Sequence, residues 1–275
     1  MLLVVRELGA EIARGTRSTV HAWGDDAVIK VPHADTPDEW IGYEATYTAA
    51  VHAVGAPVPR LIGVEVLAGR PASVFERVHG PSMWTVVVAD PSSCTAMARE
   101  LAELQQRLFD VVPPVALPAQ RDRLASKIRV AARTVDPTAA LALALLDDVA
   151  GPMRLCHGDL HPDNVIVTSR GLVVIDWFDA TRGAPMADVA RTSLLLGDAY
   201  PQRQLPRHLP GASIELLRRF HAAYRERIAE LIELDDRVIH TWQTIEVAAR
   251  LAEGVAQDGL LDVWRTRRAE LSPVS

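Results

Sequence analysis

The sequence has few cysteines, no basic excess and no long apolar run. Only Cys94 and Cys156 occur in 275 residues, far apart and without metal-ligand spacing, which favours a reducing compartment. The net charge of -6 gives no sign of nucleic-acid binding. No apolar run approaches the roughly 20 residues that span a bilayer, and the start of the chain lacks the basic and apolar regions of a secretory signal. We therefore expect a cytoplasmic protein with no nucleic-acid or membrane partner.

The first eighty residues alternate short strand-like runs with turn signals. The triplet Gly24-Asp25-Asp26 is a hairpin signal between two of these runs. One helix interrupts them, for which Thr36 is the expected N-cap, Pro37 the first-turn residue and Gly55 the stop. The predicted strands are 2–8, 18–23, 26–31, 60–67 and 71–78. Residues 1–78 are therefore predicted to form a small antiparallel β lobe with one helix.

After Gly80-Pro81 the pattern becomes helical. Apolar residues recur at helical spacing, and serines at the start of the first segment are expected to cap it. The predicted helices are 91–112, 120–135 and 137–150, followed by a hairpin of strands 165–168 and 172–176 and a helical tail from about 213 to 270. The fold class is therefore α+β, with residues 79–275 as a larger, mainly helical lobe.

The segment CHGDLHPDN, residues 156–164, alternates histidine and aspartate as a metal site would. Transition-metal hydrolases need further ligands, usually histidines or carboxylates from later in the chain. The later histidines, His208, His221 and His240, have no partner at ligand spacing. A metal hydrolase is therefore an alternative that the sequence disfavours.

Phosphoryl transfer explains the same segment better. It needs a carboxylate near the acceptor hydroxyl and oxygen ligands for the Mg²⁺ that bridges the nucleotide phosphates. Asp159 suits the first role, and Asn164, five residues later, suits the second. The following hairpin returns Asp176 towards Asn164, so the spacing can deliver all three groups to one place.

The motifs CHGDLHPDNVIV, VVIDW and ADVAR resemble those of the aminoglycoside phosphotransferase family. The resemblance runs through nearly the whole chain, because GYEATYTAAVHAVGAPVPRLIGVE, FERVHG and the late AARLAEG follow in the order that the family shows. It implies a two-lobed, protein-kinase-like fold that binds ATP or GTP together with Mg²⁺.

The resemblance also implies a role for each matching residue. Asp159 would be the catalytic aspartate, with Asn164 and Asp176 as metal ligands. Lys30 would contact the nucleotide phosphates and pair with Glu44, although Glu39 competes as its partner. The other implied positions are Gly15, Thr16 and Ser18 in the phosphate-covering loop 13–21, Glu76 and Val78 in the adenine-binding connection 75–78, and His157 and Asp188 as supports of the catalytic loop.

Three departures separate the sequence from protein kinases. The loop 13–21 has one glycine, Gly15, where protein kinases carry a glycine-rich run. Gly158 stands in place of their catalytic-loop arginine, and the stretch between Asp176 and Asp188 is too short for an activation segment. A protein substrate is therefore disfavoured.

Three residues are candidates for the acceptor site. Asp179 could reach a substrate amine, and Trp242 and Glu246 could line the acceptor pocket. For the helix around residues 239–255 we favour the plainer interpretation, an apolar face in the core with its charges in solvent.

The expected function is phosphorylation of a hydroxyl on a small, cationic molecule by a monomer or homodimer. An aminoglycoside or another aminated antibiotic or sugar is the acceptor that the resemblance implies. The alternatives are a kinase of a metabolite such as choline, homoserine or a fructosamine, and a non-catalytic nucleotide-binding protein of kinase shape.

Overall fold

The computed structural model describes residues 8–149, 151–198, 213–254 and 257–271. Contacts divide the chain into two compact units. The first holds residues 1–80 and 166–178, and the second holds 81–165 and 179–275. The hairpin that follows residues 156–164 therefore belongs with the amino-terminal unit, although a single division at residue 78 would assign it to the helical part.

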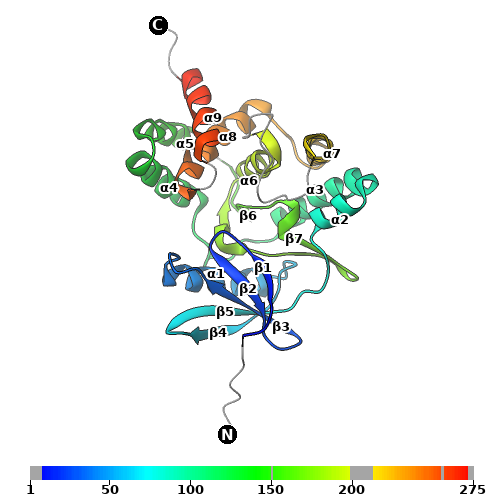
Figure 1. Cartoon of the computed structure of the whole chain (residues 1–275). Coiled ribbons are helices and arrows are strands. Elements are labelled where there is room, and N and C mark those ends of the chain that lie inside the picture. Colours follow the sequence, from blue (N-terminus) through cyan, green and yellow to red (C-terminus); the bar gives the residue numbers. More distant parts are fainter. Residues whose placement is uncertain (1–7, 150, 199–212, 255–256, 272–275) are drawn as a thin grey trace. The chain divides into compact units, whose positions relative to one another are not determined.

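The first unit is built on a five-stranded antiparallel sheet with strand order β1-β2-β3-β5-β4 (Figure 1). The helix α1 packs on β4 and β5. Residues two apart on β3 and on β5 point to the same face of the sheet, which places Ile29, Ala72 and Val74 in a small core. The elements are β1 (Glu11–Arg14), β2 (Ser18–Ala22), β3 (Ala27–Pro32), α1 (Asp38–Ala53), β4 (Leu61–Leu67) and β5 (Arg70–Glu76), with the hairpin β7 (Val165–Thr168) and β8 (Gly171–Val174).

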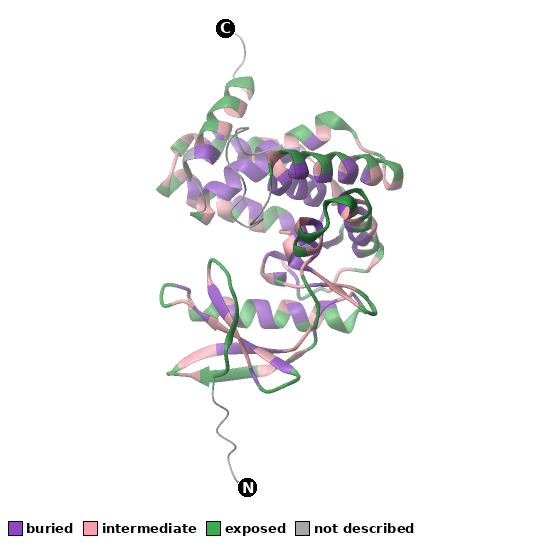
Figure 2. Ribbon diagram, turned by 45° about the vertical axis from the view of Figure 1, so that its right-hand side comes forward, coloured by how far each residue is buried: buried purple, intermediate pink, exposed green. Residues whose placement is uncertain are grey.

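The second unit is mainly helical. Its helices turn their buried sides towards one another and their exposed sides outward, as the purple and green faces in Figure 2 show. Along α3 the buried positions include Leu101, Leu104 and Leu108, the apolar face that the sequence predicts. The elements are α2 (Met83–Ala89), η1 (Pro91–Ser93), α3 (Cys94–Asp110), α4 (Gln120–Thr134), η2 (Pro137–Leu141), α5 (Ala142–Asp148), β6 (Arg154–Cys156), η3 (Pro162–Asn164), η4 (Trp177–Asp179), β9 (Thr181–Gly183), α6 (Pro185–Ser193), η5 (Leu194–Asp198), α7 (Ile214–Leu231), α8 (Asp236–Arg250), η6 (Leu251–Glu253) and α9 (Gln257–Leu271).

Most predicted elements are present; some differ at their ends, and β1, α2, β6 and β9 are additional to those predicted. Gly24 has the positive φ of +77° that the hairpin between β2 and β3 needs, and Gly55, with φ +82°, follows the end of α1. The N-cap prediction for Thr36 is wrong. Pro37 occupies that position, and the Thr36 hydroxyl instead donates to the Arg17 carbonyl at 2.7 Å.

The start of the helical unit also differs from the prediction. A separate helix, α2, was not predicted, and it is capped by Ser82, whose hydroxyl accepts from the Thr85 backbone N–H. The serines ahead of α3 do not cap it, because Asp90 caps the short η1 turn and the Ser93 side chain makes no cap hydrogen bond. The predicted strand 2–8 falls almost entirely outside the described residues. Within the described ranges, no helix combines the length and apolar character needed to cross a bilayer.

Candidate active site

In the first unit, Lys30 lies between two carboxylates. It is the fourth residue of β3, and its Nζ donates to Glu44 Oε1 at 2.7 Å and to Asp176 Oδ1 at 3.0 Å. Glu44 is buried on α1, whereas Glu39 is exposed at the start of that helix. Of the two glutamates that the sequence offers as partners of Lys30, Glu44 is the one that pairs with it.

Burial and charge act in opposite directions on this cluster. Burial alone would lower the pKa of Lys30, but the charges of Asp176 and Glu44 outweigh it and hold that pKa above its usual value. Burial raises the pKa of Glu44 even though Lys30 opposes the shift. The Lys30 ammonium is thus held in its charged form between the Glu44 and Asp176 carboxylates.

Asp176 is held in an unusual backbone conformation. Its φ is +63°, in the left-handed region that residues other than glycine rarely adopt. Such strain persists only where the surrounding structure fixes it, and it gathers at functional positions. Asp176 is also the most accessible member of the cluster, with 44% of its side chain exposed.

The residues predicted for a phosphate-covering loop lie in the turn between β1 and β2 and at the start of β2. Gly15 and Thr16 are exposed there, while Ser18 is buried at the start of β2. The Gly15 N–H donates to the Ser18 carbonyl at 2.9 Å, which closes the turn. Arg17 stacks over the rings of Trp40, at 5.2 Å, and Phe178, at 4.8 Å, a cation–π arrangement that anchors the turn within its own unit.

Residues 75–78 leave the sheet at the end of β5. The Glu76 N–H donates to the Arg60 carbonyl and the Arg77 N–H to the Asp26 carbonyl, at 2.9 and 2.8 Å. Glu76 also faces Arg60 through its half-exposed side chain. Val78 follows this hydrogen-bonded stretch. The adenine-binding role of residues 76 and 78 stays a prediction.

In the second unit, Asp188 fixes the backbone of the segment 156–164, for which the sequence predicts a catalytic role. Its Oδ1 accepts from the Gly158 N–H at 2.7 Å, and its Oδ2 accepts from the His157 N–H at 3.3 Å and from Gln105 at 3.0 Å. Gly158 has a φ of +77°, and a Cβ there would lie 2.3 Å from the Asp179 carbonyl oxygen. A glycine is therefore required at this position, where protein kinases carry an arginine.

The alternating histidines and aspartates of the motif make protein contacts instead of converging on one point. His157 is buried, and its Nδ1 accepts from the Asp159 N–H at 3.2 Å. Asp163 accepts from the Ser82 hydroxyl at 2.6 Å. Within the described ranges, no three histidine, cysteine or acidic side chains converge as a metal site. The transition-metal hydrolase interpretation therefore finds no ligand set in that part of the chain.

Asp159 itself is paired with a residue that the sequence analysis did not identify. Its Oδ1 accepts from Arg191 NH2 at 2.8 Å, and His161 Nε2 lies 4.0 Å from its Oδ2. Burial would raise the pKa of Asp159, but the Arg191 and His161 charges outweigh it and hold that pKa well below its usual range. The Asp159 side chain keeps 28% of its surface exposed, enough to receive a ligand.

The residues available for Mg²⁺ are oxygen donors. Asn164 uses its amide nitrogen on the Asp159 carbonyl at 3.0 Å, which leaves Oδ1 as its coordinating atom. Asp176 uses Oδ1 on Lys30 and keeps Oδ2. A hard cation such as Mg²⁺ prefers amide and carboxylate oxygens, so each of these two residues, taken by itself, offers an atom of the kind it binds.

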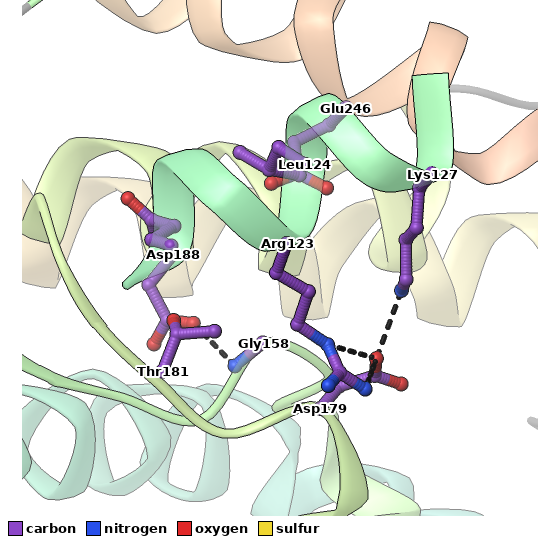
Figure 3. A pocket seen from close by; sticks show the side chains of 9 residues that line it. Arg123, Leu124, Lys127, Gly158, Asp179, Thr181, Asp188 and Glu246 are labelled. Atoms are coloured by element: carbon purple, nitrogen blue, oxygen red, sulfur yellow. Dashed lines mark hydrogen bonds and ion pairs between the residues drawn. The ribbon is translucent and has the colours of Figure 1, made fainter. Parts of the chain in front are cut away.

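A small polar cavity in the second unit contains two of the three predicted acceptor residues. Asp179 and Glu246 line it together with Arg123 and Lys127 of α4 (Figure 3). It has about 20 Å³ of space for water, enough to hold a water molecule. The third predicted residue, Trp242, lies in the hydrophobic core with Ile245 and is absent from the cavity wall.

The carboxylates around this cavity are already paired. Arg123 and Lys127 converge on Asp179 Oδ1, each at 2.8 Å (Figure 3). Lys127 also reaches Glu253 at 2.8 Å. In the described residues ion pairs join four carboxylates and four cations here: Asp159, Asp179, Glu246 and Glu253 with Arg123, Lys127, Arg191 and Arg250. Asp188 also lines the cavity and adds a fifth carboxylate, which accepts from the Gly158 N–H. Most of the negative charge here is therefore already engaged.

The two glutamates of this network differ in pairing. Burial raises the pKa of Glu246 to about 7. Arg191, whose NH1 lies 3.8 Å from the Glu246 carboxylate, opposes this rise but does not cancel it. Burial acts in the same direction on Glu253, but Arg191, Lys127 and Arg250 outweigh it and lower that pKa to about 2. The expectation that the charges of this helix lie in solvent is wrong for Glu246 and Arg250, which are both buried.

The sequence signal for the missed residues was present but not decisive. Arg191 follows Asp188 by three positions, so the two share one face of α6. Glu253 belongs to the late AARLAEG segment. Nothing in helical periodicity indicates that these residues and Lys127 meet, because they come from three distant stretches of the chain.

Comparison with known proteins agrees with this geometry. The model of the phosphotransferase enzyme family matches residues 9–231, more than half of the chain. No curated protein matches the sequence. Among solved structures, the GDP complex of aminoglycoside 2'-phosphotransferase-IIIa superposes with a TM-score of 0.59 at 18% identity, covering 98% of this chain and 95% of that one.

Two further structures show the same fold. Aminoglycoside-3'-phosphotransferase of type VIII has a TM-score of 0.60 at 19% identity, covering 89% of this chain and 93% of the other. The ADP and streptomycin complex of APH(3'')-Id from Streptomyces rimosus has a TM-score of 0.58 at 20% identity, covering 84% and 90%. The β-sheet unit and the helical unit thus have the kinase-like fold of these enzymes, and with its family match the chain belongs to the phosphotransferase enzyme family.

Proposed function

We propose that this kinase-type phosphotransferase moves the γ-phosphoryl group of ATP to a hydroxyl of a small molecule in a Mg²⁺-dependent reaction. The observation that carries the proposal is the position of Lys30 between Glu44 and Asp176. That arrangement offers one cation to nucleotide phosphates and one carboxylate to the metal that bridges them. ATP, ADP and GDP complexes among the similar structures support a nucleotide donor, and GTP is the alternative.

Asp159 would orient the acceptor. The acceptor oxygen attacks the γ-phosphorus, the bond to the β–γ bridging oxygen breaks, and the hydroxyl proton passes to Asp159. Mg²⁺, held by Asn164 and Asp176, would neutralise charge on the phosphates. Because the transition state is loose, positioning and charge neutralisation contribute more than strong base catalysis. A pKa of Asp159 below its usual range is compatible with such a role.

An aminoglycoside or another aminated molecule is the first candidate acceptor. Similar structures hold kanamycin and streptomycin, which supports this class. A metabolite with fewer positive charges, such as choline, homoserine or a fructosamine, is the second. The specific observation in its favour is that Asp179 is engaged by Arg123 and Lys127, which leaves little unpaired negative charge for a polycation. A cytoplasmic location fits the two buried, unpaired cysteines.

The test is an ATP-consumption screen over aminoglycosides, amino sugars, amino alcohols and hydroxylated amino acids. Asp159→Ala should abolish transfer to any accepted compound and leave ATP affinity largely intact. Arg227→Gln, which removes an ion pair with Glu103 on the helical unit, is a matched control and should retain full turnover. Full activity of the Asp159→Ala enzyme would contradict the assignment.

A further inference from the structure

We infer that Arg191 is a positioning residue that sets the orientation of the Asp159 carboxylate. The inference rests on the proposed function of Asp159. Arg191 lies on α6, and only 3% of its side chain is exposed, so its charge acts on buried partners and not on solvent. Its NH2 group donates to Asp159 Oδ1 at 2.8 Å and to Glu253 Oε2 at 3.1 Å.

One face of α6 therefore fixes the catalytic segment twice. Asp188 holds the backbone through the Gly158 and His157 N–H groups, and Arg191, three residues later, holds the Asp159 side chain. Residues three apart lie on the same side of a helix. Without the second contact, the Asp159 side chain could rotate about its own bonds even while its backbone stayed in place.

Arg191 is itself held from the opposite side. Glu253 of η6 accepts from it, and Glu246 of α8 lies 3.8 Å from its NH1. Glu253 is in turn shared with Lys127 at 2.8 Å and Arg250 at 3.7 Å. Because these partners are buried, the guanidinium has a defined place, which is what a group that orients another requires.

The orientation has a consequence for the acceptor. With Oδ1 occupied by Arg191, Oδ2 is the oxygen offered to a hydroxyl, and His161 Nε2 lies 4.0 Å from it. Arg191 thus determines which carboxylate oxygen faces the substrate. Its loss should lower turnover through misplacement of Asp159, with no effect on the Lys30 cluster that would hold the nucleotide.

A double-mutant cycle separates this role from a general structural one. The variants are Asp159→Asn, Arg191→Gln and the double variant, assayed as Mg²⁺-dependent ADP release with the acceptor found in the screen, or with water. We expect Arg191→Gln to lower kcat by about 10²-fold with an unchanged KM for ATP. In the Asp159→Asn background the same change should cost less than about twofold, because the group it acts through is already altered.

The outcomes distinguish the inference from the proposed function. Full turnover of Asp159→Asn would overturn the proposed role of Asp159. A large loss in Asp159→Asn, with Arg191→Gln costing the same factor in both backgrounds, would overturn only the positioning role. If Arg191→Gln does not fold, Arg191→Lys completes the same cycle, since it keeps the charge but not the fork geometry that bridges Asp159 and Glu253. Arg227→Gln, with turnover equal to the parent, is the control.

Discussion

Replacing Lys30 by methionine should lower the free energy of unfolding, because it leaves the Glu44 carboxylate buried without its cation. Lys30 Nζ lies 2.7 Å from Glu44 Oε1, and only 17% and 7% of the two side chains are exposed. Breaking such a buried pair from one side costs about 3–5 kcal/mol, because the remaining charge stays desolvated. The Asp176 contact adds about 0–1 kcal/mol, since water can replace Lys30 at that more exposed carboxylate.

The penalty should depend on pH in a definite direction. Burial already raises the pKa of Glu44, and removal of Lys30 raises it further. The folded state then holds a proton that the unfolded state has released, so stability falls as pH rises from the unfolded pKa of about 4.3 through the raised folded value. Lys30→Met should therefore be less destabilised at pH 5 than at pH 8.

Urea unfolding at the two pH values measures this difference, and nucleotide titration should show weakened binding in the same variant. Lys30→Met/Glu44→Gln is the decisive companion, because it removes the stranded charge and should recover much of the lost stability. Arg99→Met breaks an exposed pair with Glu230 and should cost less than about 1 kcal/mol at either pH. A Lys30→Met penalty that is equal at both pH values, with no recovery in the double variant, would refute the reasoning.

Three further predictions concern single residues. Gly158→Ala should lower both stability and turnover, because its Cβ would lie 2.3 Å from the Asp179 carbonyl oxygen at a φ of +77°; normal turnover would contradict the close approach. Glu246→Gln should flatten the loss of stability between pH 5 and pH 8 by up to roughly 3 kcal/mol, since the folded pKa of Glu246 is raised to about 7 and protonation favours the fold below it; an unchanged pH profile of unfolding would count against this. Asp176→Ala should weaken Mg·ATP far more than metal-free ATP, measured by calorimetry with and without Mg²⁺, and equal weakening would argue against metal binding.

The sequence was most informative where local chemistry and order along the chain agreed. The Gly24 turn, the apolar face of α3 and the hairpin that carries Asp176 follow from turn residues and periodicity. Lys30 and Glu44 could be proposed as partners only through the resemblance, because fourteen residues and a change of element separate them. Family motifs thus supplied the long-range pairing that local rules lack.

Sequence reasoning failed where a polar side chain had two plausible environments. Thr36 suits an N-cap, yet its hydroxyl is taken by the Arg17 carbonyl, and a proline holds the cap position. Glu246 and Arg250 were expected in solvent because charges on a helix usually lie there. They are buried because each has an oppositely charged partner: Glu246 lies near Arg191, and Arg250 lies near Glu253. The sequence of one helix does not reveal such ion pairs between distant segments.

The hairpin of residues 166–178 constrains how this enzyme can be recombined. It is packed with the β-sheet unit, and the Val174 N–H donates to the Pro57 carbonyl at 2.7 Å, yet the chain enters it from Val165 and leaves it to Asp179 of the helical unit. A gene cut at Gly80 would yield a sheet in which Lys30 keeps Glu44 and loses Asp176. Chimeras meant to exchange acceptor preference between relatives should therefore carry three junctions, near residues 80, 165 and 178, with the hairpin inherited from the parent that donates the sheet.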